Sequence, residues 1–212
     1  MEFPAGGLLD VEHAAGSLTI EGRDQPGIEI RTIKTTKDDF APADRQQGLK
    51  DLDQVRFAPE RKADKLTLTM MYPRYGHFLF YAGSTRFHLE THIYVPRDAR
   101  LDIHGEGQIY IEQVTGAVQA DISHGTILLR LAENGQYNIN ARSRFGNVVS
   151  DFPGQERKTS LQVGHQFTER YGATNKALPG TSGQKLDLRT GYGDIVILKI
   201  RKPPEPLAAK VK

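Results

Sequence analysis

A glycine, one polar residue and then aliphatic residues at alternating positions recur along this chain. Such alternation is typical of a strand that buries one face and exposes the other. The glycine that precedes each run allows the backbone angles of a sharp corner. The pattern predicts short strands, each entered through a tight turn. The copies are Gly16-Ser17-Leu18-Thr19-Ile20, Gly107-Gln108-Ile109-Tyr110-Ile111, Gly125-Thr126-Ile127-Leu128-Leu129, Gly146-Asn147-Val148 and Gly193-Asp194-Ile195-Val196-Ile197.

A second series of strands interleaves with the first, at Gly116–Ile122, Gly135–Ala141 and Leu186–Leu188. Two strands then occupy about twenty residues, which favours a parallel β-helix whose successive coils stack and share one aliphatic interior. An antiparallel barrel or meander would give similar alternation, but its hairpins would use Asn-Gly or Asp-Gly turns. Asn134-Gly135 is the only such pair in the sequence. The expected fold is therefore an all-β solenoid forming a single domain over residues 1–200.

Residues 34–65 interrupt the repeat with a charged segment. Its apolar residues recur at spacings of three behind Pro42, and they are Leu49, Leu52 and Val55. This spacing predicts a short amphipathic helix near 43–55. We expect the helix to cap an open end of the coil, because exposed strand edges pair with other chains.

Two further segments depart from the strand pattern. Residues 164–183 are rich in Gly, Thr, Ser and Asn and predict a loop inserted between coils. Residues 201–212 contain three prolines and predict a disordered tail.

Composition and charge exclude some classes of protein. Of 212 residues, 28 are basic and 26 acidic, so a net charge of +2 gives no strong field toward nucleic acid or anionic lipid. The chain has no cysteine, which excludes disulfides and thiolate chemistry. No apolar run could span a bilayer, and Met1–Gly7 lacks a signal-peptide pattern. The start Met1-Glu2-Phe3 suggests that a native signal or membrane anchor precedes this sequence.

In the stretch Ile93–Ile103, a strand ends in Val95-Pro96 and a short polar turn follows, before the glycine-led strands begin. This arrangement resembles the DUF4097 family of bacterial adhesin-like proteins. Gly193-Asp194-Ile195 matches the family's recurring Gly-Asp-Ile, and the likeness extends from about Gly16 to Ile200. It implies a right-handed, single-stranded parallel β-helix in an exported or anchored envelope protein. It brings no catalytic residues and no cofactor.

An aromatic segment between two predicted strands is the best binding candidate. Aromatic side chains are enriched at protein and carbohydrate contacts, although they also pack over core ends. The residues are Tyr72, Tyr75, Phe78, Phe80 and Tyr81. Arg130, Arg142 and Arg144 could likewise form a basic stripe for an anionic ligand, or merely keep a strand face soluble.

His88, Glu90 and His92 would share one face of a strand and could hold a divalent metal. A simpler explanation is that these three residues form the solvent-exposed face of the strand, opposite Leu89 and Thr91.

Two other groups carry catalytic residue types. Asp121, Ser123 and His124 contain the residues of a hydrolase triad, but triad partners normally converge from separate elements. An acidic column of Asp102, Asp121 and Asp187, with Asp151 and Asp194 nearby, invites comparison with enzymes that cut polysaccharides through paired carboxylates. We expect an exposed polar ladder instead.

The sequence thus predicts a non-enzymatic envelope module that binds a surface protein or glycan, with no nucleic-acid partner and no cofactor. A polysaccharide-acting enzyme on the same fold and a self-assembling structural unit remain as alternatives.

Overall fold

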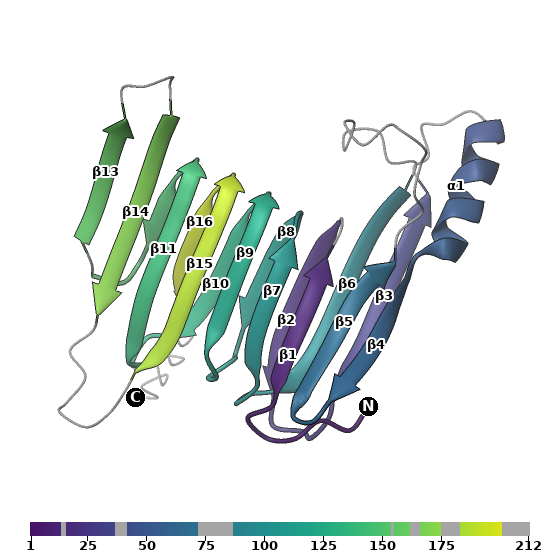
Figure 1. Cartoon of the computed structure of the whole chain (residues 1–212), viewed down its shortest axis with the longest axis horizontal. Coiled ribbons are helices and arrows are strands. Elements are labelled where there is room, and N and C mark those ends of the chain that lie inside the picture. The colour runs from purple at the N-terminus through teal and green to yellow at the C-terminus, as the bar shows by residue number, and fades with distance from the viewer. Residues whose placement is uncertain are drawn as a thin grey trace, which may run out of the picture.

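The computed structural model describes residues 1–13, 16–36, 42–71, 87–153, 155–161, 166–174 and 183–200. These residues form an all-β protein with one short helix, in which two mixed sheets lie face to face (Figure 1). The aromatic segment that contains Tyr72, Tyr75, Phe78, Phe80 and Tyr81 lies outside the described residues, and so does the tail 201–212.

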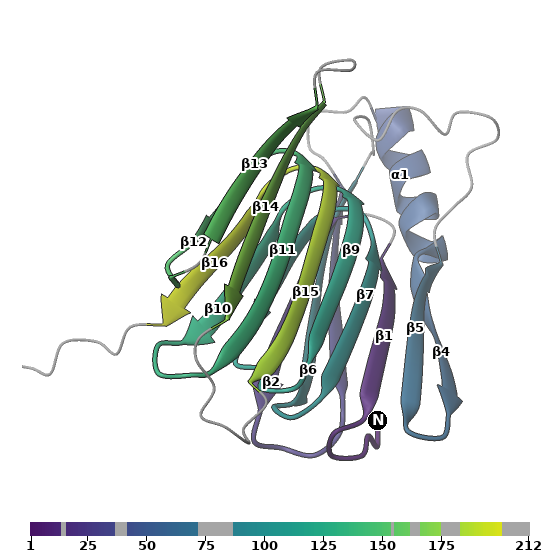
Figure 2. The same cartoon turned by 60° about the vertical axis from the view of Figure 1, so that its left-hand side comes forward.

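The larger sheet has nine strands and forms the near layer in Figure 2. In spatial order they are β13 (Gln155–Leu161), β14 (Gln166–Thr174), β11 (Tyr137–Phe145), β15 (Gln184–Tyr192), β9 (Val118–His124), β7 (Arg100–Gly105), β1 (Leu8–His13), β5 (Lys65–Met71) and β4 (Arg56–Lys62). The smaller sheet has seven strands: β12 (Val148–Ser150), β16 (Ile195–Ile200), β10 (Ile127–Ala132), β8 (Gln108–Glu112), β2 (Ser17–Arg23), β6 (Phe87–Pro96) and β3 (Glu29–Thr36).

The chain crosses from the nine-stranded to the seven-stranded sheet at each predicted glycine corner. The corner glycines stack on one another in a column. A Cβ on Gly107 (φ +111°) would collide with the carbonyl oxygen of Gly16, and one on Gly125 (φ +122°) with that of Gly107. The column continues through Gly193 and Gly146. Glycine is therefore required by close backbone packing between neighbouring coils as well as by its φ angle.

The inward residues of both sheets form one continuous aliphatic core, as the alternation predicted. In β9, Val118, Ala120 and Ile122 are buried while the residues between them are exposed. Strands β10 and β16 contribute Ile127 and Ile195, which are fully buried neighbours in register. Because the interior is shared, each coil depends on the coils beside it to bury its aliphatic side chains.

The stacking order differs from the prediction that successive coils pack on each other. Strands β1 and β2 lie between the β5/β6 and β7/β8 pairs, and β15 and β16 lie between β9/β10 and β11/β12. All of these neighbours pair in parallel. Each coil has a similar glycine corner and similar aliphatic residues. These features determine where the chain crosses between the sheets, but they do not determine which coil packs beside it. The result is two facing sheets in which neighbouring strands come from coils that are not consecutive in the chain. A simple β-helix of consecutive coils is not confirmed.

Antiparallel strands complete both ends of the molecule. Strand β3 pairs with β6 and β4 with β5 at one end, while β14 pairs with β11 and β13 at the other. The prediction of a loop over 164–183 is therefore wrong for Gln166–Thr174, which forms β14. Small polar residues obscured a strand whose partners come from elsewhere in the chain.

The predicted helix is present as α1 (Pro42–Gln54), with Pro42 at its first position. Leu52 and Val55 pack with Met70 and Leu89 in a small cluster at the β3 and β4 end, whereas Leu49 is 51% exposed. No helix in the described ranges has the length and apolar character needed to cross a membrane.

Candidate functional site

Strand β6 presents His88, Glu90 and His92 on its outward side, between the buried residues Leu89 and Thr91. Their positions follow the alternation that the sequence predicted. Their potential ligand atoms do not all lie within 4.8 Å of one another. Residues two apart on a strand are separated by about 6.6 Å, so the three side chains are spread along the strand and do not converge on one point. A metal-binding role for these residues stays a prediction.

The described residues contain one compact group of metal-ligand types, which the sequence analysis missed. Asp10 on β1 and Asp102 on β7 are register partners, and the ligand atoms of Asp10, Asp102 and His104 lie within 4.8 Å of one another. His104 Nε2 is 2.9 Å from Asp102 Oδ1. The contact lacks hydrogen-bond alignment, because that oxygen has no hydrogen-bond partner among the described atoms.

A lysine already supplies positive charge to this group. Lys65 Nζ lies 2.7 Å from Asp10 Oδ2, and the hydroxyl of Thr67 donates a hydrogen bond to the same oxygen. The hydrogen bond to Asp10 raises the pKa of the Lys65 ammonium. Lys65 therefore offsets one of the two carboxylate charges in this group. Only strand pairing could reveal it, because Asp10 and Asp102 are 92 residues apart in sequence.

The predicted acidic column is only partly formed. Asp102 and Asp187 belong to one outward row with Asn140, but β9 contributes Gln119 to that row. Asp121 is two residues further along β9, where it lies opposite His104 and Arg189. The expectation that Asp121 shares the column is wrong, because the register of β9 is set by its buried residues.

The residue types of a hydrolase triad serve other contacts. The Ser123 hydroxyl donates a hydrogen bond to the carbonyl oxygen of Gly105, and the His124 ring stacks on Tyr192. Through these contacts, Ser123 and His124 help to pack neighbouring coils together at the corner.

The arginines predicted as one basic stripe are divided between the two sheets. Arg130 lies on β10 of the seven-stranded sheet and forms an ion pair of 3.3 Å with Glu112. Arg142 and Arg144 lie on β11 of the nine-stranded sheet and are exposed. A single surface containing all three is therefore not formed.

A different row of arginines crosses the nine-stranded sheet. Arg189 on β15 lies opposite Arg142 on β11, which lies opposite Arg170 on β14, which in turn lies opposite Arg157 on β13. We call these four positions the arginine row. Arg142 follows buried Ala141 and precedes buried Ser143, which places Arg142 on the outward face of the sheet.

An aromatic ladder lies at the ends of β9, β15 and β11, where the chain turns through the glycine corners. The ring centroids of His124 and Tyr192 are 4.8 Å apart and those of Tyr192 and Phe145 are 4.6 Å apart, with planes within 12° of parallel. The guanidinium of Arg144 lies 5.3 Å from the centroid of Phe145. Each ladder residue immediately precedes a corner glycine. That recurring aromatic-glycine pair is the sequence signal that could have revealed the ladder.

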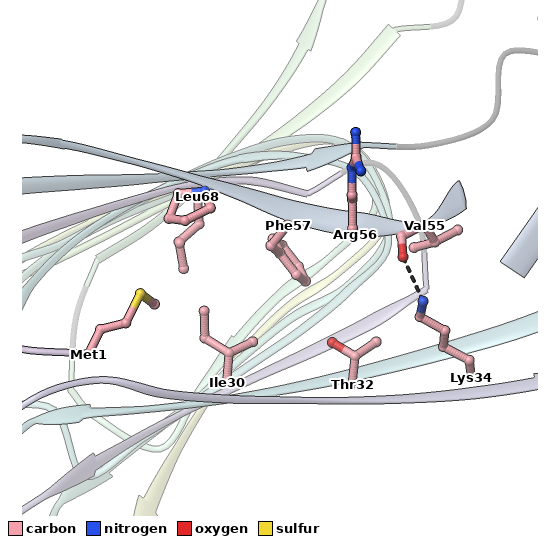
Figure 3. A pocket seen from close by; sticks show the side chains of 9 residues that line it. Met1, Ile30, Thr32, Lys34, Val55, Arg56, Phe57 and Leu68 are labelled. Carbon is pink, nitrogen blue, oxygen red and sulfur yellow. Dashed lines mark hydrogen bonds between the residues drawn. The ribbon is translucent and has the colours of Figure 1, made fainter. Parts of the chain in front are cut away.

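A second candidate is an apolar cavity of about 310 Å³ between the edge strands β3 and β4. Figure 3 shows Ile30, Thr32 and Lys34 on one side, facing Phe57 and its neighbours on the other. Lys34 Nζ donates hydrogen bonds to the carbonyl oxygens of Val55 (2.6 Å) and Leu52 (3.0 Å). These bonds hold β3 to the end of α1 and close one end of the cavity.

Comparison with known proteins supports the fold. No family model matches the chain, and no curated protein matches it either. A crystal structure described as that of a putative cell adhesion protein from Clostridium sporogenes is similar, with a TM-score of 0.53 and 12% identity. The match covers 93% of this chain and 96% of the other. At this identity, the likeness concerns the arrangement of the two sheets.

Proposed function

We propose that the chain is a non-enzymatic, adhesin-like binding module of the bacterial cell envelope. The observation that carries this proposal is the exposed pair of Arg142 on β11 and Arg189 on β15, which are register partners on the outward face of the nine-stranded sheet. Arginine is enriched at protein contact surfaces, where its planar guanidinium binds partner groups. The DUF4097-like sequence pattern and the adhesion description of the structural neighbour agree with this interpretation.

The architecture suits a rigid scaffold. We interpret the alternate crossings between sheets as coils of a right-handed β-solenoid, into which two coils insert out of chain order. Parallel pairing and a continuous buried core hold the outward side chains at fixed spacings. A surface fixed in this way binds without the entropic cost of ordering loops.

A polysaccharide-acting enzyme is a second candidate, favoured by the closeness of the carboxyl groups of Asp10 and Asp102. Two features weigh against it. Lys65 is paired with Asp10, and neither residue lines the cavity at β3 and β4 or the one beside Arg23 and Tyr94. Release of reducing ends from a polysaccharide, abolished by Asp102→Asn, would establish the enzymatic alternative.

Self-assembly by edge pairing is less consistent with the edge strand β4. It carries Pro59, which has no N–H to donate, and a charged run that ends the strand at Glu60, Arg61 and Lys62. Proline and charge are common means of preventing strand addition. Size-exclusion chromatography over a wide range of concentrations should therefore show no growth of filaments.

The proposed function is tested by binding of the purified chain to defined surfaces. We would use an array of neutral and acidic glycans together with purified envelope proteins, and follow hydrolysis of the same glycans. Saturable binding without product formation supports the proposal. Absence of binding to every surface, or turnover of a bound glycan, would contradict it.

A further inference from the structure

Strand β3 is the edge strand of the seven-stranded sheet, at the end of the molecule where β4 is the edge strand of the nine-stranded sheet. Its eight residues, Glu29–Thr36, include no proline, and most of them are β-branched. The charges on it are already engaged, Arg31 with Glu29 at 2.7 Å and Lys34 with carbonyl groups at the end of α1. An edge without proline or free charge presents N–H and C=O groups that can pair with another strand. Strand β3 is therefore a more open edge than β4.

One residue of the chain already pairs with this edge. The Met1 amine donates a hydrogen bond of 2.7 Å to the carbonyl oxygen of Ile28, and the N–H of Ile28 donates one of 2.8 Å to the Met1 carbonyl oxygen. Two residues that exchange both bonds form an antiparallel pair. Because backbone groups point alternately to the two sides of a strand, those of Ile30 and Thr32 face the same edge as those of Ile28. Within the described part of the chain, these groups of Ile30 and Thr32 have no backbone partner.

The apolar cavity lies directly behind this edge. Met1, Ile30 and Thr32 line one side of its volume of about 310 Å³, and Phe57 and Leu68 face them from the other sheet (Figure 3). Directly opposite residues of an antiparallel pair have side chains on the same face. A strand laid along β3 in the register of Met1 would therefore direct alternate side chains into the cavity. Apolar side chains fit there best, because most of the lining is aliphatic or aromatic.

The open part of the edge is short. The Met1 pair bounds it at Ile28, and the bonds from Lys34 to the end of α1 bound it at the other side, so residues 29–33 lie between them. At about 3.4 Å per residue, these five positions extend over about 17 Å. This length suits a short extended segment better than the long edge of a second sheet.

We propose that the free edge of β3 binds a short extended segment of a partner protein, which runs antiparallel to β3 and places alternate apolar side chains in the cavity. In recognition by strand addition, backbone hydrogen bonds supply affinity and pockets for alternate side chains supply specificity. The segment's residues opposite Ile30 and Thr32 form those bonds and fill the cavity. This site goes beyond the proposed function, because β3 lies at the other end of the molecule from Arg142 on β11 (Figure 1).

The test uses a labelled, acetylated five-residue peptide in which valine alternates with threonine and stands at both ends. Fluorescence anisotropy with the full chain should show saturable binding. An N-methyl group on the central valine removes an N–H that faces β3, and should weaken binding by about tenfold or more. The matched control carries the same group on a threonine, whose N–H faces away from β3, and should bind like the parent peptide. Serine in place of every valine should also weaken binding, because the cavity is then left unfilled.

Two variants of the chain test the same edge. Thr32→Pro removes an N–H that faces the open edge and breaks no hydrogen bond to β6, so it should weaken peptide binding by about tenfold or more. Ile33→Thr is the control, because Ile33 is 53% exposed on the face away from the cavity, and it should bind the peptide unchanged. Thermal denaturation shows whether Thr32→Pro is folded. If it is not, the two N-methylated peptides decide the question with the native chain.

Several outcomes overturn the inference: no binding of the valine peptide, equal losses for the two N-methylated peptides, or unchanged binding by folded Thr32→Pro. Self-association of the chain that Thr32→Pro abolishes and the peptide does not inhibit would show that a second copy occupies the edge instead. Binding of glycans or envelope proteins through Arg142 and Arg189 is a separate measurement, which Thr32→Pro should leave unchanged. Failure at β3 therefore leaves the proposed function standing.

Discussion

The ring of Tyr192 stacks on that of His124 at a centroid distance of 4.8 Å and an angle of 7°, although the two residues are 68 positions apart. Strands β15 and β9 are register partners at this point. The stack therefore joins a coil near the end of the chain to one near its middle.

Replacing Tyr192 by leucine should lower the free energy of unfolding by about 1 kcal/mol, because aromatic pairs contribute 0.5–1.5 kcal/mol beyond simple burial. Urea denaturation measures the change. Tyr110→Leu is the matched control, since Tyr110 is also exposed and has no ring partner among the described side chains. Equal losses in the two variants would show that the ladder adds no stability.

Gly125→Ala should destabilise the protein by more than about 2 kcal/mol. A methyl group there would meet the carbonyl oxygen of Gly107 and force a side chain into a positive φ. Gly6→Ala separates the two effects, because Gly6 has φ +64° and an added Cβ meets nothing within 4 Å. It should cost about 1 kcal/mol in the same denaturation experiment. A similar small cost at Gly125 would contradict close stacking of the corners.

His13 should make stability depend on pH. It is 1% exposed, and neither ring nitrogen forms a hydrogen bond within the described structure. Burial lowers the pKa of His13 to about 4, an effect that the nearby Gly16 backbone offsets only in part. The neutral ring is favoured in the folded state, whereas the unfolded chain takes up a proton below pH 6.5.

Stability should therefore fall as pH decreases from 6.5 to 4, by about 3 kcal/mol from this residue. Urea denaturation at several pH values measures the slope, which His13→Leu should reduce. The exposed residue His88 provides the control, and His88→Gln should keep the native slope. An unchanged slope in His13→Leu would refute the assignment.

Lys65→Met should lower the Tm by a few degrees. The substitution leaves Asp10, whose side chain is only 12% exposed, as a poorly compensated carboxylate beside Asp102. Adding Asp10→Asn in the same chain should restore much of the loss, because the unpaired charge is then removed. Thermal denaturation of the single and double variants measures this coupling. Additive losses would show that Lys65 stabilises the fold in another way.

The local features of the fold could be predicted from sequence because they depend on neighbouring residues. Period-two alternation determined which side of β9 and β10 is buried, and the corner glycines marked where the chain changes sheets. Pro42 and the spacing of Leu52 and Val55 located α1 within one residue at each end. Arg142 and Arg144 could be identified as candidate binding residues and His124 as a candidate catalytic residue, but their partners could not be identified.

The sequence by itself determined the strands, their inward faces and their corners, since alternation and glycine act within a few residues. The tertiary structure alone decided which coils are neighbours. It placed β1 beside β7 and β15 beside β11, brought Asp10 to Asp102, separated Arg130 from Arg142, and aligned four arginines in one row. The reason is physical: many coils carry equivalent glycine corners and aliphatic columns, so the stacking order depends on packing between segments far apart in the chain.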